Sequence, residues 1–186
     1  EVARLLARVH SVETGGLAPR PRHARLGDLP FPEAAGLPSE LADRLPRLGE
    51  LREETMRLVR ELTDSGRPLT TGVVHGDVFP GNVLVHHGRA SALLDWEEAD
   101  LDWQAYDLAI AAWFFCRAGA ELDRVALARF IAAYRAGGGT VPPAEDDLLV
   151  PFIRVKRVLE VLRAPTDRHV DWDEQLENLR AAEALG

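Results

Sequence analysis

The chain has 186 residues, of which 46% are hydrophobic and 28% are charged, and these ordinary globular values disfavour wholesale disorder. This length allows one sizeable domain with a proper core, or one domain and part of another. Its 22 basic and 30 acidic side chains give a net charge of −8. A nucleic-acid partner is therefore disfavoured, because no basic field is available for a phosphate backbone.

Cysteine content and hydropathy place further limits on the protein. Cys116 is the only cysteine, so an intramolecular disulfide is impossible, and its apolar neighbours predict a small buried residue rather than a reactive thiol. No apolar run approaches the roughly 18 residues of a membrane span, and no signal-peptide pattern opens the chain. We expect a cytoplasmic protein without a membrane partner.

The first third of the sequence predicts two helices separated by an irregular segment. Apolar residues recur at helical spacing from Val2 to Val9, and again from Leu48 to Leu62. The second helix is expected to end near Ser65-Gly66, and Pro46 is expected to kink or restart its beginning. Residues 12–38 are rich in proline, glycine and arginine, which predicts an irregular excursion.

A small hairpin sheet is predicted next. Short runs of β-forming residues occur at 73–74, at 83–85 and up to Leu94. The turn falls at His86-His87-Gly88-Arg89, where Gly88 suits a positive φ. Adjacent histidines can suggest a metal site, but a solvated hairpin tip is the simpler interpretation.

The remainder of the chain has a helical pattern from about Gln104 onward. Residues 105–116 are apolar on nearly every side, which predicts a central buried helix. Further apolar stripes lie at 127–134, 148–162 and 172–179, and Gly137-Gly138-Gly139 is expected to stop the first of these helices. The predicted fold class is therefore mainly α with a small β-hairpin sheet.

The polar motif at the hairpin identifies the chemistry. His75-Gly76-Asp77 is followed by Asn82, and Asp95 comes thirteen residues after that. The hairpin is expected to bring Asn82 and Asp95 to the same end, where two oxygen ligands can share one hard cation. These residues also have a plain interpretation, because aspartate and asparagine favour ordinary turns.

The order of these motifs, continued by Tyr106-Asp107-Leu108-Ala109, resembles the aminoglycoside phosphotransferase and choline kinase superfamily. Its members are small-molecule kinases with a protein-kinase-like fold. Phe79-Pro80-Gly81-Asn82 and Tyr106-Asp107-Leu108-Ala109-Ile110 look most like the homoserine kinases of that fold, and Leu6 to His10 resembles the helix that follows the hinge. The resemblance covers nearly the whole of residues 1–186, as a C-terminal lobe.

The resemblance implies a role for each motif residue. Asp77 would be the catalytic base or hydroxyl-orienting carboxylate, and His75 would support its loop. Asn82 and Asp95 would bind Mg²⁺, the ion that accompanies ATP in such kinases.

Three further residues receive supporting roles. Leu84 and Leu94 would form an apolar floor under the adenine, and Asp107 would hydrogen-bond the catalytic loop from the buried helix. Asp107 could instead be a helix N-cap, because an apolar helix follows it directly.

The acidic residues Glu97, Glu98, Asp100 and Asp102 are most simply a solvated loop. Glu98 nevertheless lies three residues after Asp95, where many antibiotic and choline kinases have a second acidic group. Homoserine kinases of this fold tend towards an aromatic residue there, and this difference bears on the identity of the substrate.

A kinase of this fold also needs a glycine-rich loop and a strand lysine. Neither is present, because Lys156 is the only lysine and follows the catalytic loop. We therefore expect a C-terminal catalytic and substrate lobe whose N-terminal nucleotide lobe is absent from the chain, and weak ATP binding by these residues alone.

The predicted function is ATP- and Mg²⁺-dependent phosphorylation of a hydroxyl on a small molecule. Homoserine or a similar amino alcohol is the first choice of acceptor, and an aminoglycoside is the second. One alternative is a non-catalytic binding lobe that lacks the nucleotide half. Another is a metal hydrolase built on His75, Asp77 and Asp95. Oligomeric state is left open.

Overall fold

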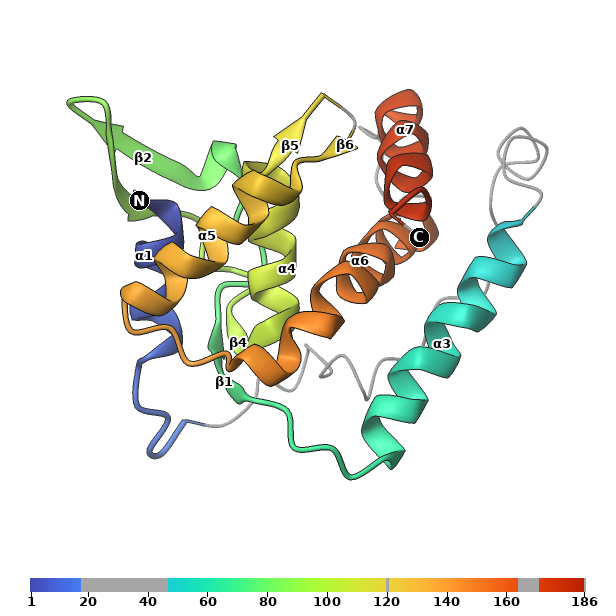
Figure 1. The fold of residues 1–186 in the computed structure, drawn as a ribbon, viewed down its shortest axis with the longest axis horizontal. Helices are drawn as coiled ribbons and strands as arrows, with labels where there is room; N and C mark the ends of the chain where they lie inside the picture. Colours follow the sequence, from blue (N-terminus) through green and yellow to red (C-terminus); the bar gives the residue numbers. More distant parts are fainter. Residues whose placement is uncertain (18–46, 120, 164–170, 186) are drawn as a thin grey trace.

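The computed structural model describes residues 1–17, 47–119, 121–163 and 171–185. Within these ranges the chain is mostly helical and contains three two-stranded antiparallel sheets (Figure 1). The α-helices are α1 (Val2–His10), α3 (Leu48–Asp64), α4 (Gln104–Phe115), α5 (Arg124–Ala136), α6 (Leu149–Arg163) and α7 (Trp172–Glu183). Two 3-10 helices are η2 (Pro80–Asn82) and η3 (Pro143–Leu148). The predicted fold class, mainly helical with small β-hairpins, is confirmed.

The strands form three separate pairs. Strand β1 (Thr71–Val74) pairs with β4 (Asp100–Trp103), and β2 (Val83–His86) pairs with β3 (Arg89–Leu93). A short hairpin of β5 (Arg117–Ala118) and β6 (Glu121–Leu122) follows α4. Along the chain, the loop that carries Asp77 connects β1 of the first pair to η2 and then to β2 of the second pair.

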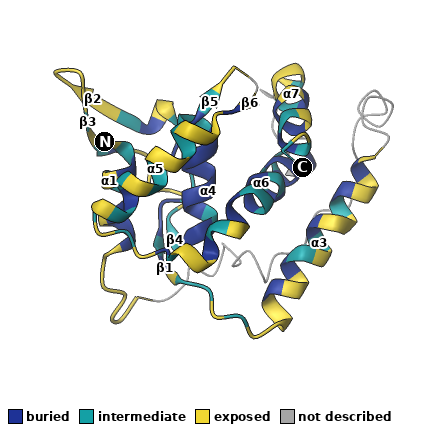
Figure 2. Ribbon diagram, viewed as in Figure 1, coloured by how far each residue is buried: buried dark blue, intermediate teal, exposed yellow. Residues whose placement is uncertain are grey.

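Helix α4 forms the centre of the core, as its apolar sequence predicts. It is buried along most of its length (Figure 2), and Leu108, Ala109, Ala112 and Trp113 are inaccessible to solvent. Its alanines have no long side chain, so α1, α5 and α6 can approach the helix closely. The buried position of α4 fixes the polar residues at its N-terminal end against the loops around them.

A smaller apolar cluster joins α3, α6 and α7. It contains leucines and valines from all three helices: Leu48, Leu51, Val158, Val161, Leu162, Leu176 and Leu179. The side chain of Asp171 accepts hydrogen bonds from the backbone N–H groups of Asp173 and Glu174, and so caps the start of α7. None of the helices in the described ranges is long and apolar enough to cross a membrane.

Two predictions about secondary structure were wrong. The acidic segment is only partly a loop, because Asp100–Trp103 forms strand β4 against β1. Acidic and apolar residues alternate there, which is the period of a strand. The Asp102 carboxylate accepts a hydrogen bond of 2.7 Å from the Trp103 N–H, and the Trp103 ring stacks on Phe152. The helical pattern is also interrupted after α4, where Gly119 at φ +67° turns the β5–β6 hairpin.

The other helix predictions from Val2 to Val9 and from Leu48 onward are confirmed, and α3 ends at Asp64 with Ser65 as its C-cap. Cys116 is buried, and burial raises the pKa of its thiol to about 11. The predicted kink at Pro46 and most of the predicted excursion at 12–38 lie outside the described residues.

Candidate active site

The β2–β3 hairpin separates an inner face from an outer face. Val83 lies opposite Leu93, which is buried, whereas Leu84 lies opposite Ala92 on the other face. Leu94 shares the face of Ala92, because alternate residues of a strand point the same way. Leu84 and Leu94 are 47% and 44% exposed. The two leucines predicted to contact adenine therefore form an open apolar face of the hairpin.

The predicted hairpin turn is confirmed. His87 and Gly88 connect β2 to β3 with φ values of +49° and +72°, as a tight two-residue turn requires. His86 and His87 are both exposed, with ring centroids 4.0 Å apart. In the part of the chain that the structure describes, no group of three His, Cys, Asp or Glu side chains could hold a metal.

Asp77 lies in the loop between β1 and η2, and Asn82 holds its position. The side-chain nitrogen Nδ2 of Asn82 donates to the Asp77 carbonyl at 2.9 Å and to Asp77 Oδ2 at 3.1 Å. Val78 next to it is completely buried and anchors the loop in the core. Both bonds use the amide nitrogen of Asn82, whereas a metal would be bound by its oxygen Oδ1.

Asp95 follows the hairpin close to Asn82. The Leu94 N–H donates to the Asn82 carbonyl at 2.8 Å, and this bond extends the β2–β3 ladder to the residue before Asp95. Asp95 is exposed and has φ +61°, a left-handed conformation that costs a non-glycine residue about 1–3 kcal/mol. Such strain is typical of functional sites.

His75 connects the loop that carries Asp77 to the segment that carries Asp95. Its Nε2 lies 3.0 Å from the Leu94 carbonyl, which can only accept, so Nε2 carries the proton. Its Nδ1 accepts a hydrogen bond of 3.3 Å from the Asp77 N–H. The ring is completely buried and lies 4.6 Å from the Trp96 ring. Because both nitrogens are engaged, His75 is a poor metal ligand, and a hydrolase centre on His75, Asp77 and Asp95 is not supported.

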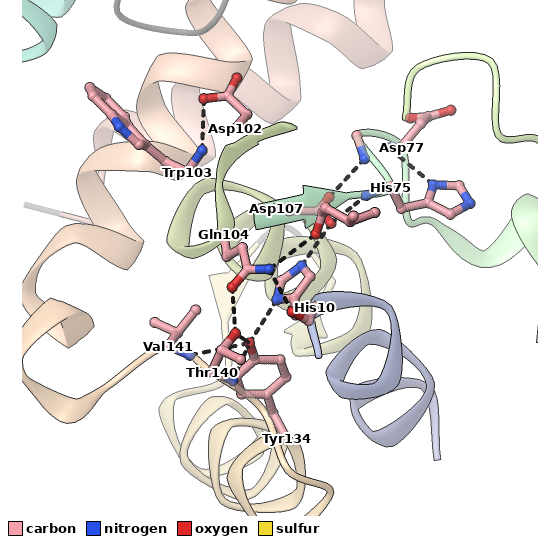
Figure 3. Close-up of polar contacts among 12 residues, drawn as sticks. His10, His75, Asp77, Asp102, Trp103, Gln104, Asp107, Tyr134, Thr140 and Val141 are labelled. Carbon is pink, nitrogen blue, oxygen red and sulfur yellow. Dashed lines mark hydrogen bonds and ion pairs between the residues drawn. The ribbon is translucent and has the colours of Figure 1, made fainter. Parts of the chain in front are cut away.

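Asp107 holds the backbone of the same loop from α4 (Figure 3). Its Oδ2 accepts from the His75 N–H at 2.8 Å, and its Oδ1 accepts from the Gly76 N–H at 2.9 Å. Trp103 is the N-cap of α4, so the alternative of an N-cap role for Asp107 was wrong. Burial alone would raise the pKa of Asp107, but the hydrogen bonds from His10, His75 and Gly76 outweigh it, and the pKa is lowered.

A buried network behind Asp107 was not predicted (Figure 3). Tyr134 Oη accepts hydrogen bonds from the Thr140 and Val141 N–H groups at 3.1 and 3.3 Å, so its own hydrogen is available to His10 Nδ1 at 2.6 Å. His10 then carries its proton on Nε2, which lies 3.0 Å from Asp107 Oδ2. Helices α1, α4 and α5 are thereby joined to the loop that carries Asp77.

Gln104 closes this network. Its Nε2 donates to the carbonyls of His10 and Val73 at 2.8 and 3.2 Å, and its Oε1 accepts from the Thr140 hydroxyl. The one visible sequence signal was His10 on the apolar face of a helix, since a buried histidine needs polar partners. Its partner Tyr134 is 124 positions away, so no local pattern pairs the two residues.

We expect Tyr134→Phe to destabilise the chain by about 1–3 kcal/mol, because buried His10 Nδ1, the buried Val141 N–H and the partly buried Thr140 N–H lose a partner. The backbone amides of His75 and Gly76 should also exchange hydrogen faster, since Asp107 would be held less firmly. Urea unfolding and amide exchange measure the two effects. Thr140→Ser keeps the hydroxyl and should leave exchange near the wild-type rate. Unchanged exchange in Tyr134→Phe would show that the phenol does not act on the loop.

Gly76 allows the segment after Asp95 to approach the loop that carries Asp77. Its φ is +84°, and a Cβ there would lie 2.6 Å from the backbone oxygen of Glu98. The Glu98 backbone therefore packs against Gly76, the residue before Asp77. The side chain of Glu98 is exposed.

Gly76→Ala is expected to destabilise the folded chain. It adds left-handed strain of about 1–3 kcal/mol and a clash with the backbone of Glu98. Gly88→Ala is the matched control, because Gly88 has φ +72° but a Cβ added there would meet no atom within 4 Å. Thermal unfolding should show the larger loss for Gly76→Ala. Equal losses would mean that the contact with Glu98 is unimportant.

The donor set at this site fits a magnesium ion. Asp95 and Asn82 offer hard oxygen atoms, and Mg²⁺ is usually held by one or two carboxylates, with phosphate and water completing its shell. The structure thus brings Asp77, Asn82 and the residue before Asp95 together through direct hydrogen bonds, with His75 and Asp107 supporting the loop.

Comparison with known proteins identifies the family. The model of the phosphotransferase enzyme family (APH) matches residues 1–148, which include the whole site. The chain belongs to this phosphotransferase family. The predicted resemblance to aminoglycoside phosphotransferase-like enzymes is thereby confirmed.

Homoserine kinases are among the relatives of this family member. The homoserine kinase of Gluconobacter oxydans (strain 621H) is 32% identical over 152 residues, which are 78% of this chain and 45% of that protein. The homoserine kinase of Granulibacter bethesdensis is 37% identical over 117 residues, 61% of this chain and 35% of that protein. The chain therefore spans less than half the length of these relatives.

Solved structures agree on the fold of the family. A macrolide 2′-phosphotransferase type I superposes with a TM-score of 0.58 at 25% identity, over 99% of this chain and 56% of that protein. A microcompartment-associated aminopropanol kinase superposes with a TM-score of 0.55 at 19% identity, over 99% of this chain and 59% of that protein. The second likeness concerns the fold alone.

Proposed function

We propose that the complete gene product transfers a phosphoryl group from ATP to a hydroxyl of a small molecule, with homoserine or a similar amino alcohol as the first choice and an aminoglycoside as the second. The observation that carries this proposal is the arrangement of Asp77, Asn82 and Asp95. Asn82 fixes the Asp77 carboxylate and is joined by a ladder hydrogen bond to Leu94, next to Asp95. The homoserine kinase relatives support the choice of acceptor.

In this proposal Asp77 aligns the acceptor hydroxyl and accepts its proton as the oxygen attacks phosphorus. Its carboxylate is partly exposed, so a substrate can reach it, while the hydrogen bonds from Asn82 limit its rotation. Such alignment matters because phosphoryl transfer depends on positioning and charge neutralisation rather than on covalent chemistry.

Asn82 Oδ1 and the Asp95 carboxylate would hold Mg²⁺ in this proposal. The ion, when bound, offsets the negative charge on the β- and γ-phosphates of ATP. Asp95 follows the end of β3 and has a left-handed backbone, which supports a special role for this residue. His75 and Asp107 bind no substrate in this scheme and keep the loop in place.

The apolar face of Leu84 and Leu94 would receive the adenine ring. Both side chains are exposed beside the metal-binding residues, and exposed large apolar groups gathered at one face favour a binding surface. Glu98 and its acidic neighbours would face the cationic amine of the acceptor.

A non-catalytic binding lobe is the second candidate, because the one lysine of the sequence, Lys156, lies on α6 and pairs with Glu160. A panel of hydroxyl acceptors offered to the complete gene product with ATP and Mg²⁺ distinguishes the two. ADP formation with homoserine supports the first choice, and turnover of kanamycin-like compounds alone would replace it by the second. The absence of turnover with every acceptor would favour the binding lobe.

A further inference from the structure

Two arginines share the aromatic side chains at the C-terminal end of α4. The guanidinium of Arg157, on α6, lies 5.9 Å from the centre of the Trp113 ring and 5.2 Å from that of Phe114. Arg117, directly after α4, lies 4.8 Å from the same Trp113 ring. Arg157 is only 2% exposed, which is unusual for a charged side chain.

The charges around these arginines do not balance. Arg157 pairs with Glu160 at 2.7 Å, and Lys156 pairs with the same carboxylate at 3.4 Å. Arg117 forms no ion pair with any residue in the described ranges, and it donates instead to Asn178 Oδ1 at 2.6 Å and to a backbone carbonyl. Three cations therefore share one paired carboxylate in a largely buried place, where excess charge is costly unless it is offset.

Two hydrogen-bond donors at the same place lack an acceptor. Trp113 Nε1 and Arg157 Nε are both buried, and neither has a hydrogen-bond partner among the residues that the structure describes. A buried donor without a partner costs about 1–3 kcal/mol. Glu160 Oε2 also lacks a hydrogen bond, although it is in ion-pair contact with Arg157. The two unused donors and the surplus positive charge together favour an oxyanion.

This cluster lies next to the catalytic loop. The Phe114 ring is 5.8 Å from the ring of Phe79, two residues after Asp77. Burial lowers the pKa of Arg157, and the nearby charge of Asp77 opposes that shift. Figure 1 shows α6 and the β2–β3 hairpin on opposite sides of α4. Arg157 therefore comes from an element separate from the hairpin that carries the proposed adenine-contacting residues.

We infer that Arg157 and Arg117 bind the carboxylate of the phosphate acceptor, which makes the substrate a small hydroxy amino acid rather than a plain amino alcohol. The planar fork of arginine matches a carboxylate, and half-buried Arg117 gives the cluster its accessible side. Homoserine carries a hydroxyl and a carboxylate in one small molecule, and in this inference the hydroxyl meets Asp77 while the carboxylate meets the arginines. This inference rests on the proposed function and deepens it.

The test compares homoserine with 3-amino-1-propanol, which is homoserine without its carboxylate. For the complete gene product we expect kcat/KM to favour homoserine by about 10- to 100-fold, the range for charge-assisted hydrogen bonds. Arg157→Lys should lower this preference at least several-fold, because the fork is lost while the charge remains. Arg117→Gln, at a half-buried position, should also lower it and guards against misfolding of the first variant. Arg154→Lys on the same helix is the control. Wild-type Arg154 donates to the backbone carbonyls of Ala182 and Glu183, so this variant should keep the wild-type preference.

The outcomes separate this inference from the proposed function. A wild-type protein that phosphorylates both acceptors equally well would overturn the carboxylate site and leave the kinase proposal standing. If Arg157→Lys lowers kcat/KM for both acceptors by the same factor, the arginine acts on the phosphoryl group, and the inference is also wrong. Phosphorylation of neither acceptor would remove the proposed function and the inference together.

Discussion

Asp77→Asn is expected to lower kcat of the complete gene product by about 10²- to 10⁴-fold, the usual contribution of a positioned general base. The amide has nearly the same shape as the carboxylate, and its oxygen can still accept the hydrogen bond from Asn82 Nδ2. The loop should therefore keep its conformation, and KM for the acceptor should change much less than kcat. A coupled assay of ADP formation, with acceptor concentration varied, separates the two constants.

Asp64→Asn provides the control for this substitution. Asp64 is exposed at the end of α3, far along the chain from the site, and its replacement removes the same charge. Its kcat should stay near the wild-type value. Substantial turnover in Asp77→Asn, at more than about a tenth of wild type, would remove Asp77 from the proposed role.

Asp107→Asn is expected to destabilise the chain by about 3 kcal/mol or more, because several hydrogen bonds to a buried charged group are lost and each contributes about 1.5–3 kcal/mol. Both carboxylate oxygens accept backbone hydrogen bonds, and Oδ2 also accepts from His10. An amide has one oxygen, so its NH₂ group would face a backbone N–H that also donates. Urea unfolding should show a lower midpoint with little change in slope.

The pH dependence of stability follows from the same residue. The pKa of Asp107 is lowered from its ordinary value of 3.8, so its stabilising effect is fully present above about pH 4 and is lost as the pH falls through the lowered value. Asp107→Asn should remove this part of the acid sensitivity. Asp123→Asn is the control, because Asp123 is an exposed N-cap and asparagine caps helices equally well. An Asp107→Asn protein as stable as the control would contradict the network.

The sequence was most informative where a pattern is local. Residues 105–116, apolar on nearly every side, predicted α4 as the central buried helix, and the turn residues at His87 and Gly88 predicted the hairpin. The spacing of Asn82 and Asp95 across that hairpin follows from antiparallel pairing, because residues that flank a short turn return to the same end.

Contacts between distant segments could not be predicted in the same way. The bond from Tyr134 to His10 depends on how α5 packs on α1, and no spacing rule relates positions so far apart. Strand β4 was missed because its acidic residues suggested solvent, although their alternation with Leu101 and Trp103 has the period of a strand. The cluster of Arg157 and Arg117 likewise exists only after α6 packs on α4.

The central claim is that Asn82 and Asp95 bind a divalent ion at the phosphates of ATP, beside Asp77. Titration of the complete gene product with Mn²⁺, followed by electron paramagnetic resonance in the presence of a non-hydrolysable ATP analogue, tests it directly. We predict nucleotide-dependent Mn²⁺ binding that weakens at least about tenfold in Asp95→Ala and Asn82→Ala, since each loses a ligand oxygen. Nucleotide-dependent binding of unchanged affinity in both variants would contradict the account.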